Sequence, residues 1–355
     1  MQSITKKNLH PLIWLKENLF SSKLNSIISV VLIIIITKTA LGVLDWAFLS
    51  ADFTGSTREA CQSTGACWVF IKERIGQIIY GYYPESLSWR VYLSFLMIAV
   101  SITGVLTDWL GNRKVWLFIC CILMPITVWF FLKGGFLGLS PVETSKWGGL
   151  LVTIIVSFVG ICFSLPLGVL LALGRRSELP VIKIGSVIFI EFWRGVPLIT
   201  VLFMSSVMIP IFLPESMQFD KLLRALLGVF LFSAAYMAEV VRGGLQAIPK
   251  GQYEAADSLG LNYFNKMRLI IVPQALKLVI PGIVNNFIGL FKDTSLVAII
   301  GMFDLLGIVQ AANSDPDWLG FATEGYVAAG LIFWVFCYSM SRYSQKLEKT
   351  LTVTR

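Results

Sequence analysis

The stretch EAADSLG, residues Glu254 to Gly260, is a short polar segment in a chain that is otherwise strongly apolar. It lies inside a longer polar insert, IPKGQYEAADSLGLNYFNKMRLIIVPQ, with apolar runs on both sides. The residues before Gly260 favour a helix, and a glycine takes the left-handed backbone angles that end one. LNYFNKMRLIIV then returns to helical spacing, and Pro273 marks the re-entry into the membrane. The insert is therefore predicted to be two short helices around a glycine, a rigid knob rather than a loose tether.

The composition is that of a protein that crosses a membrane many times. Of the 355 residues, 56% are hydrophobic and only 14% are charged, whereas soluble domains have about 45–50% apolar and about 25% charged residues. A helix needs about 20 apolar residues to cross a bilayer. The sequence predicts an all-α polytopic membrane protein with about eight spans, at roughly 26–49, 90–110, 115–139, 148–174, 184–212, 224–246, 277–300 and 323–343.

The distribution of lysine and arginine predicts the orientation of these spans. Cytoplasmic loops carry an excess of basic residues, and here the excess falls near the N-terminus, at 113–114, at 175–183, at 250–268 and in the tail. The loop from Phe303 to Glu324 has no basic residue. With an even number of spans, both termini are predicted to lie in the cytoplasm. The net charge of +8 is then explained by basic residues in the cytoplasmic loops of a protein in a lipid membrane, and no nucleic-acid partner is predicted.

The spans divide the chain into three predicted parts. Residues 1–147 form an N-terminal extension with three spans and one long external loop. Residues 148–345 hold five spans with tighter linkers and most of the unusual polar residues, and residues 346–355 form a cytoplasmic tail.

The cysteines suggest one disulfide and no metal site. Cys61 and Cys67 lie in the polar segment CQSTGAC, which falls on the external side, where a disulfide persists. The only histidine, His10, lies in the polar N-terminal segment, so histidine-based metal or catalytic chemistry is not expected. The four remaining cysteines lie in apolar runs and are predicted to pack as small hydrophobic side chains: Cys120, Cys121, Cys162 and Cys337.

Charged residues inside the spans are the candidates for a substrate path. A charge at mid-helix costs about 2.5–3.5 kcal/mol on insertion scales, so it marks function by default. Glu191 and Arg194 lie three residues apart on one helical face and can pair. Gly195 and Pro197 follow, and they are predicted to interrupt the fifth span and free backbone groups that must face protein or a water-filled cavity.

Two further polar groups lie in later spans. Glu239 and Arg242 repeat the acidic–basic spacing at the inner end of the sixth span, where an interfacial salt bridge is an equal alternative. The seventh span contains four consecutive polar residues, which predict a broken or cavity-lining helix: Lys292, Asp293, Thr294 and Ser295. The cation and the carboxylate suit the two charged ends of an amino acid, and a pair that only packs helices together is the alternative.

Three segments of the chain carry a family resemblance. The pattern E-A-A, three residues, G, nine residues, I-x-x-P resembles the EAA loop of the membrane subunits of bacterial ABC importers, and it is met by Glu254, Ala255, Ala256, Gly260, Ile270 and Pro273. The usual loop ends in Leu-Pro, and Val272 takes the leucine's place here. AAYMAEVVRGGLQAIPKGQYEAADSLGL, FWRGVPLI and KDTSLVAIIG resemble the polar amino-acid (histidine, glutamate and general L-amino-acid) permeases of that family. The extra N-terminal spans resemble the long membrane subunits of Gram-negative general L-amino-acid uptake systems.

This resemblance implies a type I permease core of five helices in the bacterial inner membrane. A second, homologous permease subunit would pair with that core, and a periplasmic amino-acid-binding protein would deliver L-amino acids to it. A cytoplasmic ATPase dimer would bind the EAA knob and drive alternating access from periplasm to cytoplasm. The chain has no GxxxxGK[ST] phosphate loop, so ATP and Mg²⁺ are expected on the ATPase, and no cofactor is expected on this chain.

Two other classes of protein fit the sequence less well than a transporter subunit. A membrane-embedded enzyme needs a nucleophile with its base, or a metal, and the chain has no GxSxG and no suitable histidine. Lys292 and Ser295 are three residues apart, so a Ser–Lys dyad stays open on sequence grounds. A passive channel would not need the EAA knob. The sequence therefore predicts a transporter permease subunit rather than an enzyme.

Overall fold

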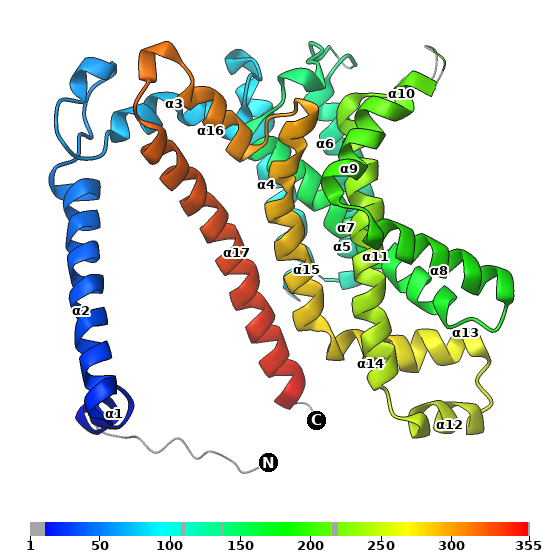
Figure 1. The fold of residues 1–355 in the computed structure, drawn as a ribbon. Helices are drawn as coiled ribbons and strands as arrows, with labels where there is room; N and C mark the ends of the chain where they lie inside the picture. Colours follow the sequence, from blue (N-terminus) through cyan, green and yellow to red (C-terminus); the bar gives the residue numbers. More distant parts are fainter. Residues whose placement is uncertain (1–10, 108–110, 137, 213, 215–218, 354–355) are drawn as a thin grey trace. The chain divides into compact units, whose positions relative to one another are not determined.

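The chain is built from α-helices in the computed structural model, which describes residues 11–107, 111–136, 138–212, 214 and 219–353 (Figure 1). Within those residues there are three isolated β-bridges and no extended strand, so the predicted all-α class is confirmed. Parts of four predicted segments lie outside the described residues: the cytoplasmic N-terminus with His10, the span ends near 108–110 and at 137, and the end of the tail at 354–355.

The chain folds as two compact units, Met1–Glu73 and Arg74–Arg355. The first contains α1 (Pro11–Asn18) and α2 (Lys23–Leu44), which continues as a π-helical turn through Leu49. The loop after α2 is closed by a disulfide between Cys61 and Cys67, whose Cα atoms are 5.5 Å apart. The indole of Trp68 donates to the carbonyl of Ala47 at 2.7 Å, which ties the loop back to the end of the span.

The second unit contains the remaining helices, and α3 (Trp68–Tyr80) leads into it from the first. Its helices before the polar insert are α4 (Ser88–Leu106), α5 (Arg113–Phe118), α6 (Met124–Lys133), α7 (Gly149–Arg175), α8 (Pro180–Gly195), α9 (Leu198–Phe203), α10 (Ile209–Phe212) and α11 (Lys221–Ala247). The insert and the segments after it form α12 (Lys250–Ser258), α13 (Tyr263–Asn265), α14 (Val272–Leu278), α15 (Ile280–Asp293), α16 (Leu305–Asn313) and α17 (Ala322–Val353).

Seven of the predicted spans correspond to apolar helical stretches. In the described residues, six helices are long and apolar enough to cross a membrane, and α8 with the helix after it makes a seventh if the bent pair is one span. The sequence predicted about eight spans, and the one not found among these seven is the span predicted at 323–343, which lies in α17. This helix is long enough to cross, at 32 residues, but Glu324 and Arg342 limit the length of its apolar stretch.

The predicted interruption of the fifth span is confirmed. Helix α8 ends at Gly195, the next helix begins after Pro197, and the two axes meet at 102°. A proline disfavours helical angles in the residue before it, here Val196, which is extended. The bend turns α8 sharply away from the second half of the span (Figure 1).

The next span begins close to the predicted start at residue 277. Pro273, which was expected to mark the re-entry into the membrane, is the second residue of α14 and follows directly on a π-helical stretch, Lys266–Ile271. Proline is tolerated in a first helical turn, where its missing N–H is not needed. The break falls instead at Val279, and the span runs from Ile280 to Ile300.

The core of the second unit is the contact between α7 and α11, which is the most extensive contact between two helices in it.

A second close contact joins α11 to α14. Small residues allow helix backbones to approach closely, as is usual in membranes. At Gly244 of α11, an added Cβ would lie 2.6 Å from the carbonyl oxygen of Ala275 on α14. The polar insert is therefore packed tightly against α11 through α14.

A buried carboxylate organises the connection between α15 and α16. Asp304 is fully buried, and it caps α16 by accepting a hydrogen bond from the amide of Gly307 at 2.9 Å. Its second oxygen has no hydrogen-bond partner among the described residues. Burial raises the pKa of Asp304 from 3.8 to about 6. The folded protein thus holds this proton to a higher pH than the unfolded chain does.

Replacing Asp304 with asparagine is expected to stabilise the protein above pH 6. Because the folded-state pKa is raised, the stability associated with this group is present below about pH 4 and is lost as the pH rises to about 6. The loss corresponds to about 3 kcal/mol at most, and asparagine keeps the cap. Thermal unfolding of the purified protein between pH 4 and pH 8 checks this. An Asp304→Asn variant with the same pH profile as the parent protein would contradict it.

Candidate functional site

A cluster of five charged side chains joins three helices, α7, α8 and α11. Its centre is Glu239 on α11, whose carboxylate contacts three arginines from three different helices. The distances from its oxygens are 2.9 Å to Nη1 of Arg175 on α7, 3.6 Å to Nη1 of Arg194 on α8 and 2.7 Å to Nη2 of Arg242 on α11. Its side chain is only 16% exposed. One carboxylate therefore holds the ends of α7 and α8 to α11.

The pairing within the cluster differs in part from the prediction. Glu239 and Arg242 pair as expected from their spacing. Glu191 pairs with Arg175 at 2.9 Å, whereas Arg194 reaches Glu239 and lies over the ring of Tyr236 at 5.7 Å. The predicted Glu191–Arg194 pair on one face of α8 is therefore not the pair that forms, because the neighbouring helices supply closer partners.

Arg175 is the member of the cluster that sequence reasoning missed. It is the last residue of α7 and was treated only as a topology signal. Two consecutive arginines at one span end are more than orientation needs, and that excess was the available clue. With Arg175 included, the cluster holds three cations and two carboxylates, so one cation is in excess.

The polar run in the seventh span forms a tightened helix rather than a break. Helix α15 ends at Asp293, and the chain continues as a 3₁₀ segment from Thr294 to Ile300. The hydroxyl of Ser295 donates to the carbonyl of Lys292 at 3.0 Å, and that of buried Thr294 donates to Phe291 at 2.8 Å. Both hydroxyls are thus bonded to backbone, and no Ser–Lys contact is formed in the described residues.

Lys292 and Asp293 are exposed at the surface of the chain. Within the described residues neither side chain forms an ion pair. No hydrogen bond or ion pair links them to the Glu239 cluster in that part of the chain. The predicted substrate-path residues therefore form two separate groups. The residues of the Glu239 cluster form ion pairs with one another, whereas Lys292 and Asp293 form no ion pair in the described residues.

The EAA segment forms the helix that the sequence predicted. Helix α12 runs from Lys250 to Ser258, and Gly260 then takes a φ of +70°. Glu254 and Ala255 are exposed and Ala256 is fully buried, so the motif has one exposed face and one face packed on its own fold. Lys266 Nζ lies 2.5 Å from Asp257 Oδ1, which links α12 to the helical segment after the turn.

Arg176 connects α12 to the membrane helices. Its Nη1 donates to the carbonyl of Leu245 on α11 and to the hydroxyl of Tyr253 on α12, both at 3.0 Å. The guanidinium also lies over the ring of Tyr253, 5.6 Å from its centre. These residues form part of the wall of a cavity of about 430 Å³ between α12 and the ends of α7 and α11. Arg176, which contacts α12, is therefore the neighbour in sequence of Arg175, which pairs with Glu239.

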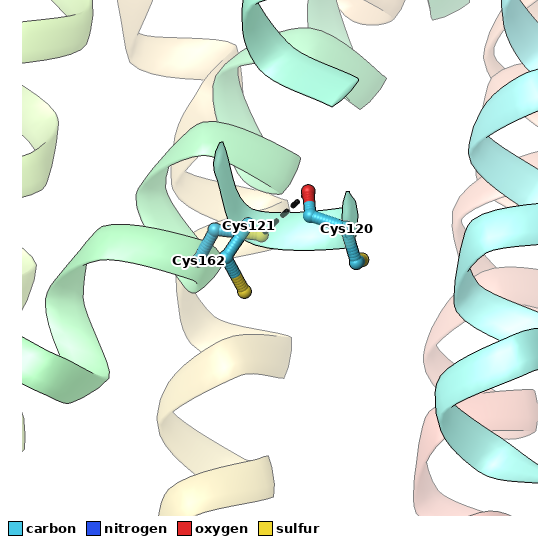
Figure 2. Close-up of side chains that lie close together, drawn as sticks. All are labelled: Cys120, Cys121 and Cys162. Carbon is cyan, nitrogen blue, oxygen red and sulfur yellow. Dashed lines mark hydrogen bonds between the residues drawn. The ribbon is translucent and has the colours of Figure 1, made fainter. Parts of the chain in front are cut away.

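Three cysteines lie together elsewhere in the second unit (Figure 2). Cys120 and Cys121 belong to a π-helical turn between α5 and α6, and Cys162 lies on α7. Their sulfurs lie within 4.8 Å of one another, and they form the one group in the described residues with metal-ligand spacing. The thiol of Cys162 donates to the carbonyl of Cys120 at 3.9 Å. Sequence reasoning treated the three as independent small hydrophobic side chains and did not bring them together.

Comparisons with known proteins identify the family. The model of the family described as "Binding-protein-dependent transport system inner membrane component" matches residues 164–353, which include α12 and the Glu239 cluster. The chain is 57% identical to the inner membrane amino-acid ABC transporter permease protein YhdY of Escherichia coli (strain K12), over 97% of this chain and 94% of that protein. It is 38% identical to the glutamate/glutamine/aspartate/asparagine transport system permease protein BztC of Rhodobacter capsulatus, over 95% and 93%.

Solved structures agree with this. In the crystal structure of an amino acid ABC transporter with histidines, one chain superposes with a TM-score of 0.50 at 30% identity, over 57% of this chain and 92% of its own length. The remainder of this chain has no counterpart in that match, whereas both long relatives align with nearly all of it. The chain therefore belongs to the family of binding-protein-dependent transport system inner membrane components, and it is a multi-pass inner-membrane permease subunit of an ABC importer rather than an enzyme.

Proposed function

We propose that the chain moves L-amino acids from the periplasm to the cytoplasm by alternating access. As an ABC importer permease, it works with an ATPase and a substrate-binding protein. The proposal adds an amino-acid cargo and a second, homologous permease subunit as the pairing partner. The names of the two long relatives, both amino-acid transport permeases, support the cargo.

The observation that carries the coupling mechanism is the attachment of α12 through Arg176. In this mechanism an ATPase dimer holds ATP and Mg²⁺, binds the outward face of α12 at Glu254 and Ala255, and moves the helix as it closes. The bonds from Arg176 to Tyr253 and Leu245 pass that motion to the ends of α7 and α11. In this proposal α12 and both termini lie in the cytoplasm, and α17 is an eighth crossing that makes the number of crossings even.

The substrate path follows from the two groups of charged residues. The Glu239 cluster lies where α7, α8 and α11 meet, so relative movement of these helices must break or exchange its ion pairs. Its excess cation suits the carboxylate of an amino acid. Lys292 and Asp293 offer a second cation and carboxylate with no ion-pair partner in the described residues. We place the substrate between such groups on this chain and the partner permease.

Replacing Glu254 with alanine tests the coupling role. The side chain is exposed on α12, so its loss leaves the fold intact and removes a contact for the ATPase. Both the amount of ATPase that co-purifies with the chain and amino-acid uptake are expected to fall by about tenfold or more, as for a residue at the centre of an interface. The amount of chain in the membrane is expected to stay the same.

Glu178→Ala is the matched control for this experiment. Glu178 is an exposed carboxylate in the connection between α7 and α8, on the same side of the membrane but outside α12, and its loss should change neither measurement. If Glu254→Ala leaves ATPase retention and uptake at the parent level, α12 is not the site where the ATPase binds.

A further inference from the structure

An apolar crevice separates the helices of the N-terminal extension from the permease core. Its volume is about 490 Å³. Helices α4 and α6 form one side, and α7 with the start of α11 forms the other. Its lining includes Ile98 of α4, Phe158 and Phe163 of α7, and Leu226 of α11. The crevice lies apart from the Glu239 cluster and shares no residue with it.

The crevice has a polar end and an apolar end. Lys133, the last residue of α6, and Asp220, which caps α11, both lie at the end where α6 finishes and α7 begins. From there the α6 wall runs back to Pro125, about 12 Å along the helix. On α7 the lining residues continue to Phe163. This depth is close to that of one leaflet of a bilayer, whose whole hydrocarbon core is about 30 Å thick.

The rim of the crevice faces the surroundings of the chain. Ile126 and Phe130, on α6, are 51% and 53% exposed, whereas Val128 and Leu226 at its floor are buried. The helices α4, α6, α7 and α11 all belong to stretches that are long and apolar enough to cross a membrane. The rim therefore opens on an apolar surface of these helices, and walls this apolar do not hold water.

The charges at the polar end specify what enters. Asp220 is already bonded, because it accepts from the hydroxyl of Thr144 at 2.7 Å and the amide of Leu222 at 2.9 Å. Lys133 is exposed, lies over the ring of Trp129 at 5.8 Å, and forms no ion pair with a carboxylate in the described residues. Lysine and tryptophan side chains at the end of a span commonly lie at the level of the lipid headgroups.

We propose that this crevice binds a phospholipid, with an acyl chain along α7 and the anionic phosphate on Lys133. The lipid fills the seam between the extension and the core. Its chain covers the apolar walls between Ile155 and Phe163, and its headgroup neutralises Lys133, the one cation among the described residues that line the crevice.

Native mass spectrometry of the chain tests this proposal, after reconstitution in nanodiscs of phosphatidylethanolamine and phosphatidylglycerol and release into mild detergent. The parent protein should retain a bound phospholipid. Lys133→Ala should weaken retention by about fivefold, the value of one lysine near an anionic surface. Lys146→Ala, an exposed lysine at the same end that does not line the crevice, should retain lipid as the parent protein does.

Val159→Trp provides a second, steric test. Val159 lines the apolar part of the crevice and is only partly buried, so a large ring there should displace the acyl chain and abolish retention. A thermal unfolding midpoint near that of the parent shows that this variant is folded. Lipid retained equally by Val159→Trp, or no bound lipid in the parent, overturns the proposal. So does a parent protein that loses its lipid when the partner permease is co-expressed, since a helix of that partner is then the occupant.

Discussion

Replacing Glu239 with glutamine is expected to reduce amino-acid uptake by more than about tenfold. The substitution keeps the shape of the side chain but leaves Arg175, Arg194 and Arg242 facing one another, with Glu191 as the only remaining carboxylate. Removing one partner of a buried ion pair costs about 3–5 kcal/mol. The loss of stability in Glu239→Gln is expected near the lower end of this range, because the Glu239 side chain is still 16% exposed to solvent. Uptake of labelled amino acids and thermal unfolding of the same preparation measure the two effects.

A double variant separates the two roles that the cluster can have. Glu239→Gln combined with Arg242→Gln removes one charge of each sign and should recover most of the lost stability. If the cluster only packs helices, uptake recovers with it; if the cluster meets substrate or must rearrange during transport, uptake stays low. Glu143→Gln, at an exposed carboxylate far along the chain from the cluster, controls for loss of a negative charge. An uptake rate for Glu239→Gln equal to that of the parent would falsify the assignment.

Replacing Arg176 with alanine is expected to separate ATP hydrolysis from transport. The variant loses both hydrogen bonds of Nη1 and the stacking on Tyr253, so α12 is no longer attached to α11 through this side chain. The outward face of α12, with Glu254, is unchanged, and the ATPase should still bind. The ratio of amino acids imported to ATP hydrolysed is expected to fall by about tenfold, which corresponds to about 1.4 kcal/mol of lost coupling.

Two further variants sharpen this test. Arg176→Lys keeps the charge but cannot reproduce the planar stacking with its two hydrogen bonds, so its ratio should lie between those of the parent and the alanine variant. Lys183→Ala, which removes an exposed cation from α8, should leave the ratio unchanged. Loss of ATPase binding in Arg176→Ala, as expected for Glu254→Ala, would show that Arg176 belongs to the docking surface instead.

The sequence predicted the features that depend on local chemistry. Apolar length located seven of the spans, and Gly195 with Pro197 located the bend after α8. The turn at Gly260 followed from the backbone freedom of glycine. Such features are set by neighbouring residues along the chain, so the pattern of residue types is enough to find them.

The features that the sequence missed depend on how helices are rotated against each other. The partner of Glu191 is on α7 rather than on its own helix, and no periodicity along α8 contains that information. The π-helical stretch Lys266–Ile271, which leads directly into α14 and Pro273, was also not indicated by the spacing of residue types. The crevice beside Trp129 is formed by four helices together, α4, α6, α7 and α11, and no single segment indicates it.

The position of Arg175 next to Arg176 has a consequence for the transport cycle. Their Cα atoms are separated by a single peptide unit, about 3.8 Å. One side chain is bonded to the Glu239 cluster and the other to α12. Any displacement of the end of α7 therefore reaches both at the same moment and by nearly the same amount. In the proposed mechanism, a stroke of the ATPase that moves α12 would therefore also move the ion pairs of the Glu239 cluster. The ion-pair exchange and the power stroke would then share one activation barrier rather than two in succession.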